Sequence, residues 1–311
     1  LPWDGNETGA NMKLFKASTS NYRDLLKHIT LSGGKTPIFA VYNERMISEN
    51  PETTEIYAFS APNPYTVHVK YYIGKDEKFG YWRDTHLCIE GAAVTSLAVR
   101  FVLDWNYAAH ENLFLEDHLF EIPQYDRHGF DPVQIISSGP DSQTKTIHDN
   151  YLHLIHSARN HVYIQTPYFI PDASILDALK IASRSGVDVR IMIPCKPDHP
   201  FVYWATYSYI GEMVAAGAKC YVYNNGFLHA KTLSVDGMVA CVGTANMDIR
   251  SFGLNFEVNA TIYSERTVQR LERAFENDMT MSTQVTRKIY EERNLLIRFK
   301  EQFSRLLSPL L

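Results

Sequence analysis

The stretch FLHAKTLSVDGMVACVGTANMDIRSFGLNFEVN, residues 227–259, determines how the rest of this chain is interpreted. Its first part, residues 227–234, alternates apolar and polar side chains in the manner of a strand. Asp236-Gly237 is a strong two-residue turn sequence, and the apolar residues 238–242 then form a return strand. The pattern predicts a β-hairpin.

Several polar side chains gather at one end of this hairpin. His229 and Lys231 are two residues apart, so both leave the same face of the first strand. The small Gly243, the hydroxyl of Thr244 and the amide of Asn246 follow the return strand. An imidazole, an ammonium, a hydroxyl and an amide in one place suit a phosphate, because Lys231 and Asn246 can donate hydrogen bonds to its oxygens. His229 can attack phosphorus.

Attack by His229 requires an acceptor on its other ring nitrogen, which fixes the tautomer. Asp236 is a poor candidate, because it lies in the turn at the far end of the strand and suits local backbone amides. Glu257 lies in a second alternating run, residues 255–262. A neighbouring strand can bring it behind the imidazole, and we therefore expect Glu257 to orient His229.

The spacing H-A-K-x4-D-x6-G-T-x-N resembles the HKD motif of the phospholipase D superfamily, with Thr244 where serine is commoner. From about Phe79 onward the chain also resembles bacterial cardiolipin synthases, notably in FGYWRDTH, YIQTPYFIPD, PCKPDHPFVYWAT and GTANMDIRSFGLNFEVN. The resemblance implies an α/β fold of two related lobes, each with a mixed sheet flanked by helices. It implies that His229 is a nucleophile or acid, that Glu257 orients it, that Lys231, Thr244 and Asn246 bind phosphate, and that Asp236 and Gly243 are structural members of the motif.

An internal repeat supports two lobes, which we place at residues 1–131 and 132–311. A strand followed by an amphipathic helix occurs in both. Phe79, Gly80 and Asp84 recur as Phe252, Gly253 and Glu257 at an offset of 173 residues, and Val94, Leu97, Phe101 and Asp104 recur as Val268, Leu271, Phe275 and Asp278 at an offset of 174.

The first lobe departs from the family pattern, because it has no HKD motif. At the same offset, the positions of His229, Lys231 and Asp236 are filled by Ile56, Ala58 and Asn63. Asp84 occupies the place of the orienting carboxylate without a histidine of its own. His68 and Lys70 form an H-x-K, which is either a functional remnant or part of a surface strand. We expect the first lobe to be shortened.

The resemblance implies phosphatidyl transfer between two phosphatidylglycerol molecules through a phosphohistidine intermediate, with release of glycerol and without a metal or cofactor. The family uses two HKD histidines, so a single motif leaves three alternatives: a transferase, a phospholipase D-type phosphodiesterase acting as a homodimer, or a catalytically impaired synthase remnant. The expected partners are anionic phospholipids and a membrane surface. The net charge of −5 argues against nucleic acid.

Further candidate positions lie in two loops and at the C-terminus. Tyr168, Asp198 and His199 follow strands and either bind a lipid headgroup or only shape turns. Residues 286–307 predict one amphipathic helix, which either closes a domain, the alternative we favour, or lies on an anionic membrane. Its apolar face consists of Leu296, Phe299, Phe303 and Leu306.

Composition limits the compartment and the cofactors. The four cysteines are scattered without C-x-x-C spacing, which predicts free thiols in a reducing compartment and no zinc site. No apolar run reaches the roughly 20 residues of a membrane span, and no signal peptide is recognisable. Because the family usually has N-terminal membrane helices, we expect either a truncated sequence or a soluble relative, peripheral at the cytoplasmic face of the cell membrane.

Overall fold

The fold is described from a computed structural model. It describes residues 68–76, 78–89, 91–110, 112, 131–196 and 198–308 and two short strands, residues 13–15 and 56–58. The side chains of residues 1–77 lie outside the description, including those of His68 and Lys70. The chain divides into two compact units, residues 1–69 with 86–131 and residues 70–85 with 132–311.

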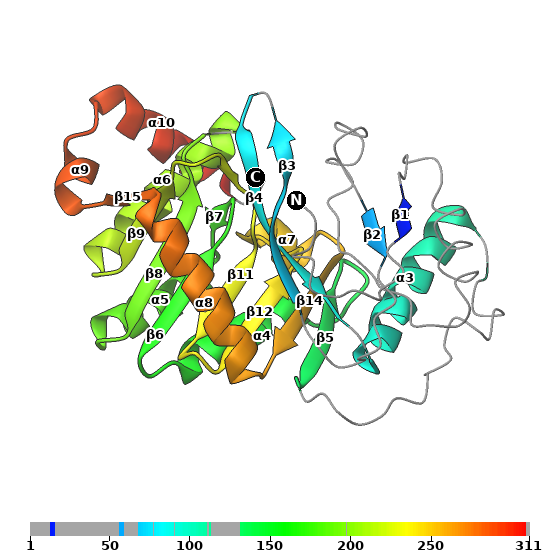
Figure 1. Cartoon of the computed structure of the whole chain (residues 1–311). Helices are drawn as coiled ribbons and strands as arrows, with labels where there is room; N and C mark the ends of the chain where they lie inside the picture. Colours follow the sequence, from blue (N-terminus) through cyan, green and yellow to red (C-terminus); the bar gives the residue numbers. More distant parts are fainter. Residues whose placement is uncertain are drawn as a thin grey trace. The chain divides into compact units, whose positions relative to one another are not determined.

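The larger unit contains an eight-stranded mixed sheet (Figure 1). Its order is β15-β9-β8-β6-β11-β12-β14-β5, in which β6, β8 and β9 run parallel and the remaining neighbours are antiparallel. The strands are β5 (Val133–Ser138), β6 (His161–Gln165), β8 (Asp188–Pro194), β9 (Lys219–Tyr223), β11 (Thr232–Val235), β12 (Val239–Gly243), β14 (Glu257–Ile262) and β15 (Ser282–Val285). A mixed sheet with helices was predicted, and this is confirmed.

Helices cover both faces of the sheet. The α-helices α4 (Thr146–Ser157), α5 (Ala173–Arg184) and α6 (Pro200–Ala215) cover one face, and α8 (Glu265–Thr280) crosses the other (Figure 1). Successive residues of β8 serve the two faces in turn: Ile191 packs in the larger core and Met192 in the core under α8. This alternation explains why residues 191–193 of β8, Ile-Met-Ile, are apolar without interruption.

The predicted hairpin is present as β11 and β12, with Thr232 opposite Val242. Asp236 and Gly237 both have positive φ, 55° and 67°, as a type I′ turn requires. The predicted first strand is interrupted, however. Its beginning, β10 (Phe227–Leu228), pairs in parallel with a different strand, and the regular β structure resumes only at Thr232.

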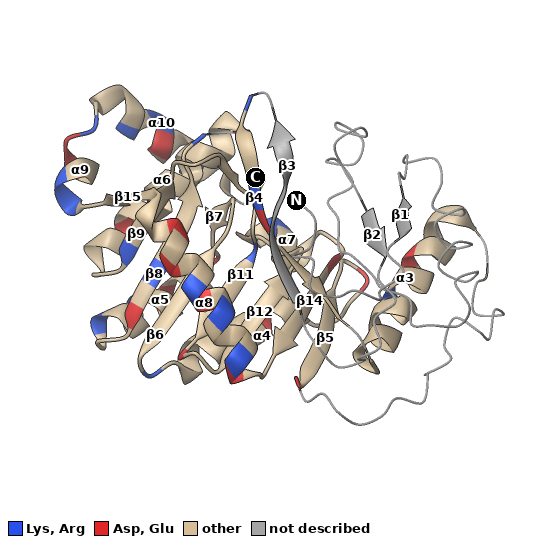
Figure 2. Ribbon diagram, viewed as in Figure 1, with Lys and Arg blue, Asp and Glu red and all other residues tan. Residues whose placement is uncertain are grey.

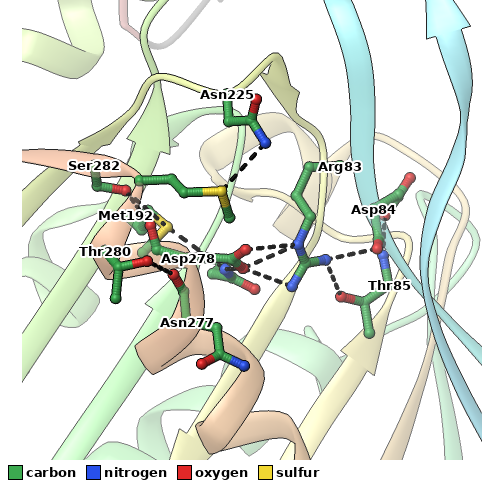
Figure 3. Close-up of polar contacts among 11 residues, drawn as sticks. Arg83, Asp84, Thr85, Met192, Asn225, Asn277, Asp278, Thr280 and Ser282 are labelled. Atoms are coloured by element: carbon green, nitrogen blue, oxygen red, sulfur yellow. Dashed lines mark hydrogen bonds and ion pairs between the residues drawn. The ribbon is translucent and has the colours of Figure 1, made fainter.

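That partner is β4 (Gly80–Cys88), which belongs with β3 (His68–Asp76) and β10 to a separate three-stranded sheet. Arg83 anchors β4 from within: it is 1% exposed, and its Nη2 lies 2.7 Å from Oδ2 of Asp278 on α8. Gln165 donates to the same oxygen at 2.8 Å. Figure 3 shows the guanidinium between Asp278 and the Asp84–Thr85 backbone and hydroxyl. The pair fixes residues 80–85 against the large sheet.

The C-terminal region forms two helices, α9 (Arg287–Glu291) and α10 (Leu295–Leu306), where a single helix was expected. Asn294 begins the second helix, because its side chain accepts a hydrogen bond from the backbone N–H of Leu296 at 2.7 Å. The short elements β7 (Phe169–Ile170), β13 (Met247–Asp248) and α7 (Ile249–Gly253) complete this unit. No helix within the described residues could span a membrane.

In the smaller unit, β1 (Lys13–Phe15) pairs antiparallel with β2 (Ile56–Ala58), and α3 (Ala93–Ala109) buries Val94 and Leu97. Both copies of the sequence repeat are therefore a strand followed by a helix: β4 before α3, and β14 before α8.

Gly226 permits the contact between β10 and β4. Its φ is +117°, and a Cβ at this position would lie 2.1 Å from the carbonyl oxygen of Tyr81. Gly186 offers a matched control, since its φ is +97° but a Cβ there would have no atom of the described residues within 4 Å. The two sites thus separate backbone strain from steric overlap.

We expect Gly226→Ala to reduce the free energy of unfolding by about 1–3 kcal/mol more than Gly186→Ala, because overlap with β4 adds to the strain. The strain by itself costs about 1–2 kcal/mol. Urea unfolding of both variants measures the difference. Equal losses for the two variants would contradict the close approach of β10 to β4.

Candidate active site

His229, Ala230 and Lys231 lie where the chain leaves the β4 sheet and joins the eight-stranded sheet. Both polar side chains are buried. Lys231 Nζ lies 2.9 Å from His229 Nε2 and also donates to the carbonyl oxygen of His229 at 2.6 Å. The expectation that the two side chains share one face is confirmed.

The carboxylate on the other ring nitrogen is Asp84, whose Oδ2 lies 2.8 Å from His229 Nδ1. An aspartate there holds the proton on Nδ1 and leaves the Nε2 lone pair directed toward Lys231. The backbone supports this contact, because the N–H of His229 donates to the carbonyl oxygen of Arg83 at 2.7 Å.

The expected pairing of Glu257 with Nδ1 is therefore corrected to Asp84. The reason is topological: β4 is the direct neighbour of β10, whereas β12 lies between β11 and β14. Glu257 accepts a hydrogen bond from Asn255 Nδ2 at 3.2 Å and lies within the electrostatic reach of Lys231. A catalytic role for Glu257 stays a prediction.

Burial determines the charge states of the central pair. Burial lowers the pKa of His229, and the positive charge of Lys231 lowers it further, against the opposing effects of Asp84 and Asp198. Burial also lowers the pKa of Lys231, to about 8, although four surrounding carboxylates act in the other direction. Around neutral pH the imidazole is consequently uncharged and the amine is charged.

The phosphate-binding candidates lie at the end of β12. Thr244 Oγ1 accepts a hydrogen bond from the N–H of Val258 at 2.9 Å, which fixes it against β14. Asn246 Oδ1 is buried and has no hydrogen-bond partner among the described residues. Gly243 must be small, because a Cβ would lie 2.2 Å from Asn259 Oδ1. Phosphate binding by this group stays a prediction.

Trp82 is a site residue that the sequence reasoning missed. Its ring centroid lies 5.3 Å from that of His229, and within the described part of the chain its buried indole N–H has no hydrogen-bond partner. A buried, unpaired donor is costly and indicates a ligand or water that accepts from it. In the sequence, Trp82 is marked only by its position next to Arg83 and Asp84. That position points to the site only once the pairing of β4 with β10 is known.

The two loops with headgroup candidates do meet. Tyr168 donates to Asp198 Oδ2, and Asp198 Oδ1 accepts from the N–H of His199 at 2.7 Å. The charge of Asp198 acts on both His229 and Lys231, so this carboxylate lies near the reacting groups. The His199 side chain is exposed. Headgroup binding by these three residues stays a prediction.

Asp236 has a structural position, as the sequence predicted. Its carboxylate accepts from the backbone N–H groups of Arg159, Asn160 and His161 at 2.7–2.8 Å. We expected it to bond local backbone amides, whereas these amides belong to the loop before β6 and to the first residue of β6. Burial would raise the pKa of Asp236, yet the three donors outweigh it and lower the pKa.

The donor set of the site is one imidazole, one amine and scattered carboxylates, hydroxyls and amides. Across the ranges that the structure describes, no cluster of three or more histidine, cysteine, aspartate or glutamate side chains could hold a metal ion. The chemistry that these groups offer is attack by a neutral imidazole on a phosphoryl centre beside a cation.

Comparisons with known proteins identify relatives of this chain. The family model described as cardiolipin synthase, PLD-like domain, matches residues 151–279. A cardiolipin synthase of Oceanobacillus iheyensis is 54% identical over 240 residues, 77% of this chain and 50% of the relative. Cardiolipin synthase 2 of Staphylococcus epidermidis is 55% identical over 241 residues, 77% of this chain and 49% of the relative. The chain spans about half the length of the curated relatives it matches.

Among solved structures, phosphatidylserine synthase of Haemophilus influenzae is similar with a TM-score of 0.56 and 14% identity. The similarity covers 74% of this chain and 65% of that one, and it shows the fold. The fold, the HKD spacing and the long stretch of sequence identity agree with one another. Over 77% of its length the chain is similar to bacterial cardiolipin synthases, and its cardiolipin synthase, PLD-like domain spans residues 151–279.

Proposed function

We propose that this protein transfers a phosphatidyl group from one phosphatidylglycerol to another and releases glycerol, with a phosphohistidine intermediate on His229. The observation that carries the proposal is the buried row Asp84–His229–Lys231. It provides an imidazole in the nucleophilic tautomer and a cation within reach of the same phosphate.

In the first step the Nε2 lone pair of His229 attacks phosphorus and forms a P–N bond. The bond from phosphorus to the glycerol headgroup oxygen breaks, and that oxygen takes a proton from a general acid. The Nδ1–H bond to Asp84 stabilises the positive charge that develops on the ring. Lys231 and the indole N–H of Trp82 donate hydrogen bonds to the phosphoryl oxygens in this proposal.

In the second step a terminal hydroxyl of the second phosphatidylglycerol attacks the phosphohistidine. The hydroxyl proton passes to the group that acted as acid, the P–N bond breaks, and neutral His229 is regenerated. The product is cardiolipin. Release of glycerol and entry of the second lipid use the same space, which the headgroup candidates Tyr168, Asp198 and His199 border.

The acid–base group of both steps is a second imidazole in this family, and this chain has one HKD motif. We propose that a second copy of the chain supplies it, so that two His229 side chains face each other across a twofold axis. The two imidazoles would then share one site, in which one attacks phosphorus and the other acts as the acid.

Substitution of the central groups tests the reaction. We expect His229→Ala to abolish cardiolipin formation from phosphatidylglycerol in mixed micelles, and Asp84→Asn to reduce kcat at least about 100-fold, because the amide no longer fixes the tautomer. Glu257→Gln should have a smaller effect. Asp177→Asn, at an exposed position on α5, is the matched control.

The products separate the alternatives. Phosphatidic acid in place of cardiolipin would indicate a phosphodiesterase, and absence of both would indicate an impaired remnant. With phosphate-labelled phosphatidylglycerol and an alkaline quench, label should remain on the wild-type protein and be absent from His229→Ala. Equal labelling of both would refute a phosphohistidine at His229.

The pH dependence follows from the two shifted groups. Since the pKa of His229 is lowered, the acid limb of kcat/KM should lie below 6.5, the ordinary value for histidine. Since the pKa of Lys231 is about 8, activity should fall as the pH rises through about 8 and the amine loses its charge. In Lys231→Arg the alkaline limb should disappear, because a guanidinium stays charged. If the alkaline limb is unchanged in Lys231→Arg, another group is responsible for the loss of activity at high pH.

A homodimer should appear in sedimentation velocity as a species near twice 35.6 kDa. Because a shared site requires association, specific activity should rise with protein concentration until the dimer is saturated. A strictly monomeric protein with concentration-independent specific activity would overturn the proposal that a second copy completes the site.

A further inference from the structure

Helix α10 turns an apolar face outward. We define the α10 apolar face as five side chains that lie on one side of the helix at spacings of one to four residues. They are Leu295, Leu296, Phe299, Phe303 and Leu306, with exposed fractions of 77%, 59%, 67%, 49% and 79%. A helix of a globular protein normally directs such a stripe into its core.

The inward side of α10 is polar and makes ion pairs with neighbouring elements. Glu301 is 1% exposed and pairs with Arg293 at 2.8 Å, and Ser304 is also buried. Arg305 donates to Ser208 Oγ at 3.1 Å and forms an ion pair with Glu212 on α6. These contacts fix the rotation of α10, because turning it inward would bury apolar side chains at the cost of the buried ion pair.

The apolar face continues toward the active site along α6. Lys300 Nζ lies 4.8 Å from the ring of Trp204, and Phe201 one turn earlier is exposed and packs edge-on against Trp204. Helix α6 begins two residues after Asp198, whose charge acts on His229 and Lys231. Figure 1 shows α10 lying next to α6.

The charge around this face is positive. Arg298 is exposed on α10 and Lys300 lies at its edge, whereas the acidic Glu301 is buried and paired. Figure 2 shows that α10 carries both basic and acidic positions. An apolar face with a cationic border suits an anionic bilayer surface. A second copy is less suited, because a twofold contact would bring each cationic border against its own equivalent.

We propose that the α10 apolar face, with Phe201 and Trp204 of α6, inserts into the headgroup region of an anionic lipid bilayer and orients the active site toward the surface from which substrate enters. The inference deepens the proposed function, since it rests on a phospholipid as substrate. It explains why aromatic and aliphatic side chains remain in water in the free protein.

Vesicle flotation tests the proposal without turnover. Wild-type protein should float with vesicles of phosphatidylglycerol and phosphatidylcholine at about 0.1 M salt and bind pure phosphatidylcholine more weakly. Each phenylalanine contributes on the order of tenfold to partitioning, so Phe299→Glu with Phe303→Glu should weaken binding about 100-fold. Ile181→Glu, at an exposed position on α5, should stay within about twofold of wild type.

A charge variant tests the second half of the argument. Arg298→Glu with Lys300→Glu should weaken binding to the anionic vesicles at least about tenfold and leave binding to phosphatidylcholine unchanged. Circular dichroism and thermal unfolding show that each variant is folded. If the double phenylalanine variant is unfolded, the milder Phe299→Ser takes its place. This variant should weaken binding about tenfold.

Two results would overturn the inference. One is wild-type flotation by the double phenylalanine variant. The other is a sedimentation coefficient of the double phenylalanine variant that differs from that of the wild type while flotation is the same. This result would indicate that the face is an interface between copies. A protein that floats but forms no cardiolipin would overturn the proposed function and leave the membrane-facing surface supported.

Discussion

The buried ion pair between Arg83 and Asp278 is the interaction on which the site depends. Arg83 belongs to β4 and Asp278 to α8, so the pair joins residues 80–85 to the helix that covers one face of the large sheet. Removing one member of such a pair typically costs about 3–5 kcal/mol, because the other is left as an uncompensated buried charge. The backbone carbonyl of Arg83 also accepts a hydrogen bond from the N–H of His229. Its neighbour Asp84 is thereby held at the imidazole.

Burial gives this arrangement its chemical character. In water, a histidine and a lysine 2.9 Å apart would have nearly ordinary pKa values, but inside the protein both lose part of their affinity for protons. Asp84 and Asp198 keep the pair from losing more, and their negative charges let an amine with a pKa of about 8 remain protonated near neutral pH. The charge states of His229 and Lys231 are therefore set by one shared environment rather than by two separate ones.

The proposed reaction also requires that a phospholipid reach the site. Helix α6 lies between the site and α10. It begins two residues after Asp198, and α10 packs against it. The polar contacts of Glu301 and Arg305 hold the outer helix with its apolar stripe away from the core. The candidate site and the outward apolar stripe consequently share α6 as a supporting element.

The sequence by itself determined the features that depend on neighbours in the chain. The Asp236-Gly237 turn, the common side of His229 and Lys231, the β–α order of the second lobe and the amphipathic C-terminus all follow from local backbone geometry and side-chain period. Only the tertiary structure decided that Asp84 holds the imidazole across 145 positions, that Trp82 lies beside it, and that α10 packs through its polar side. These depend on which strand pairs with β10 and on buried ion pairs between distant elements, and neither leaves a periodic signal in the sequence.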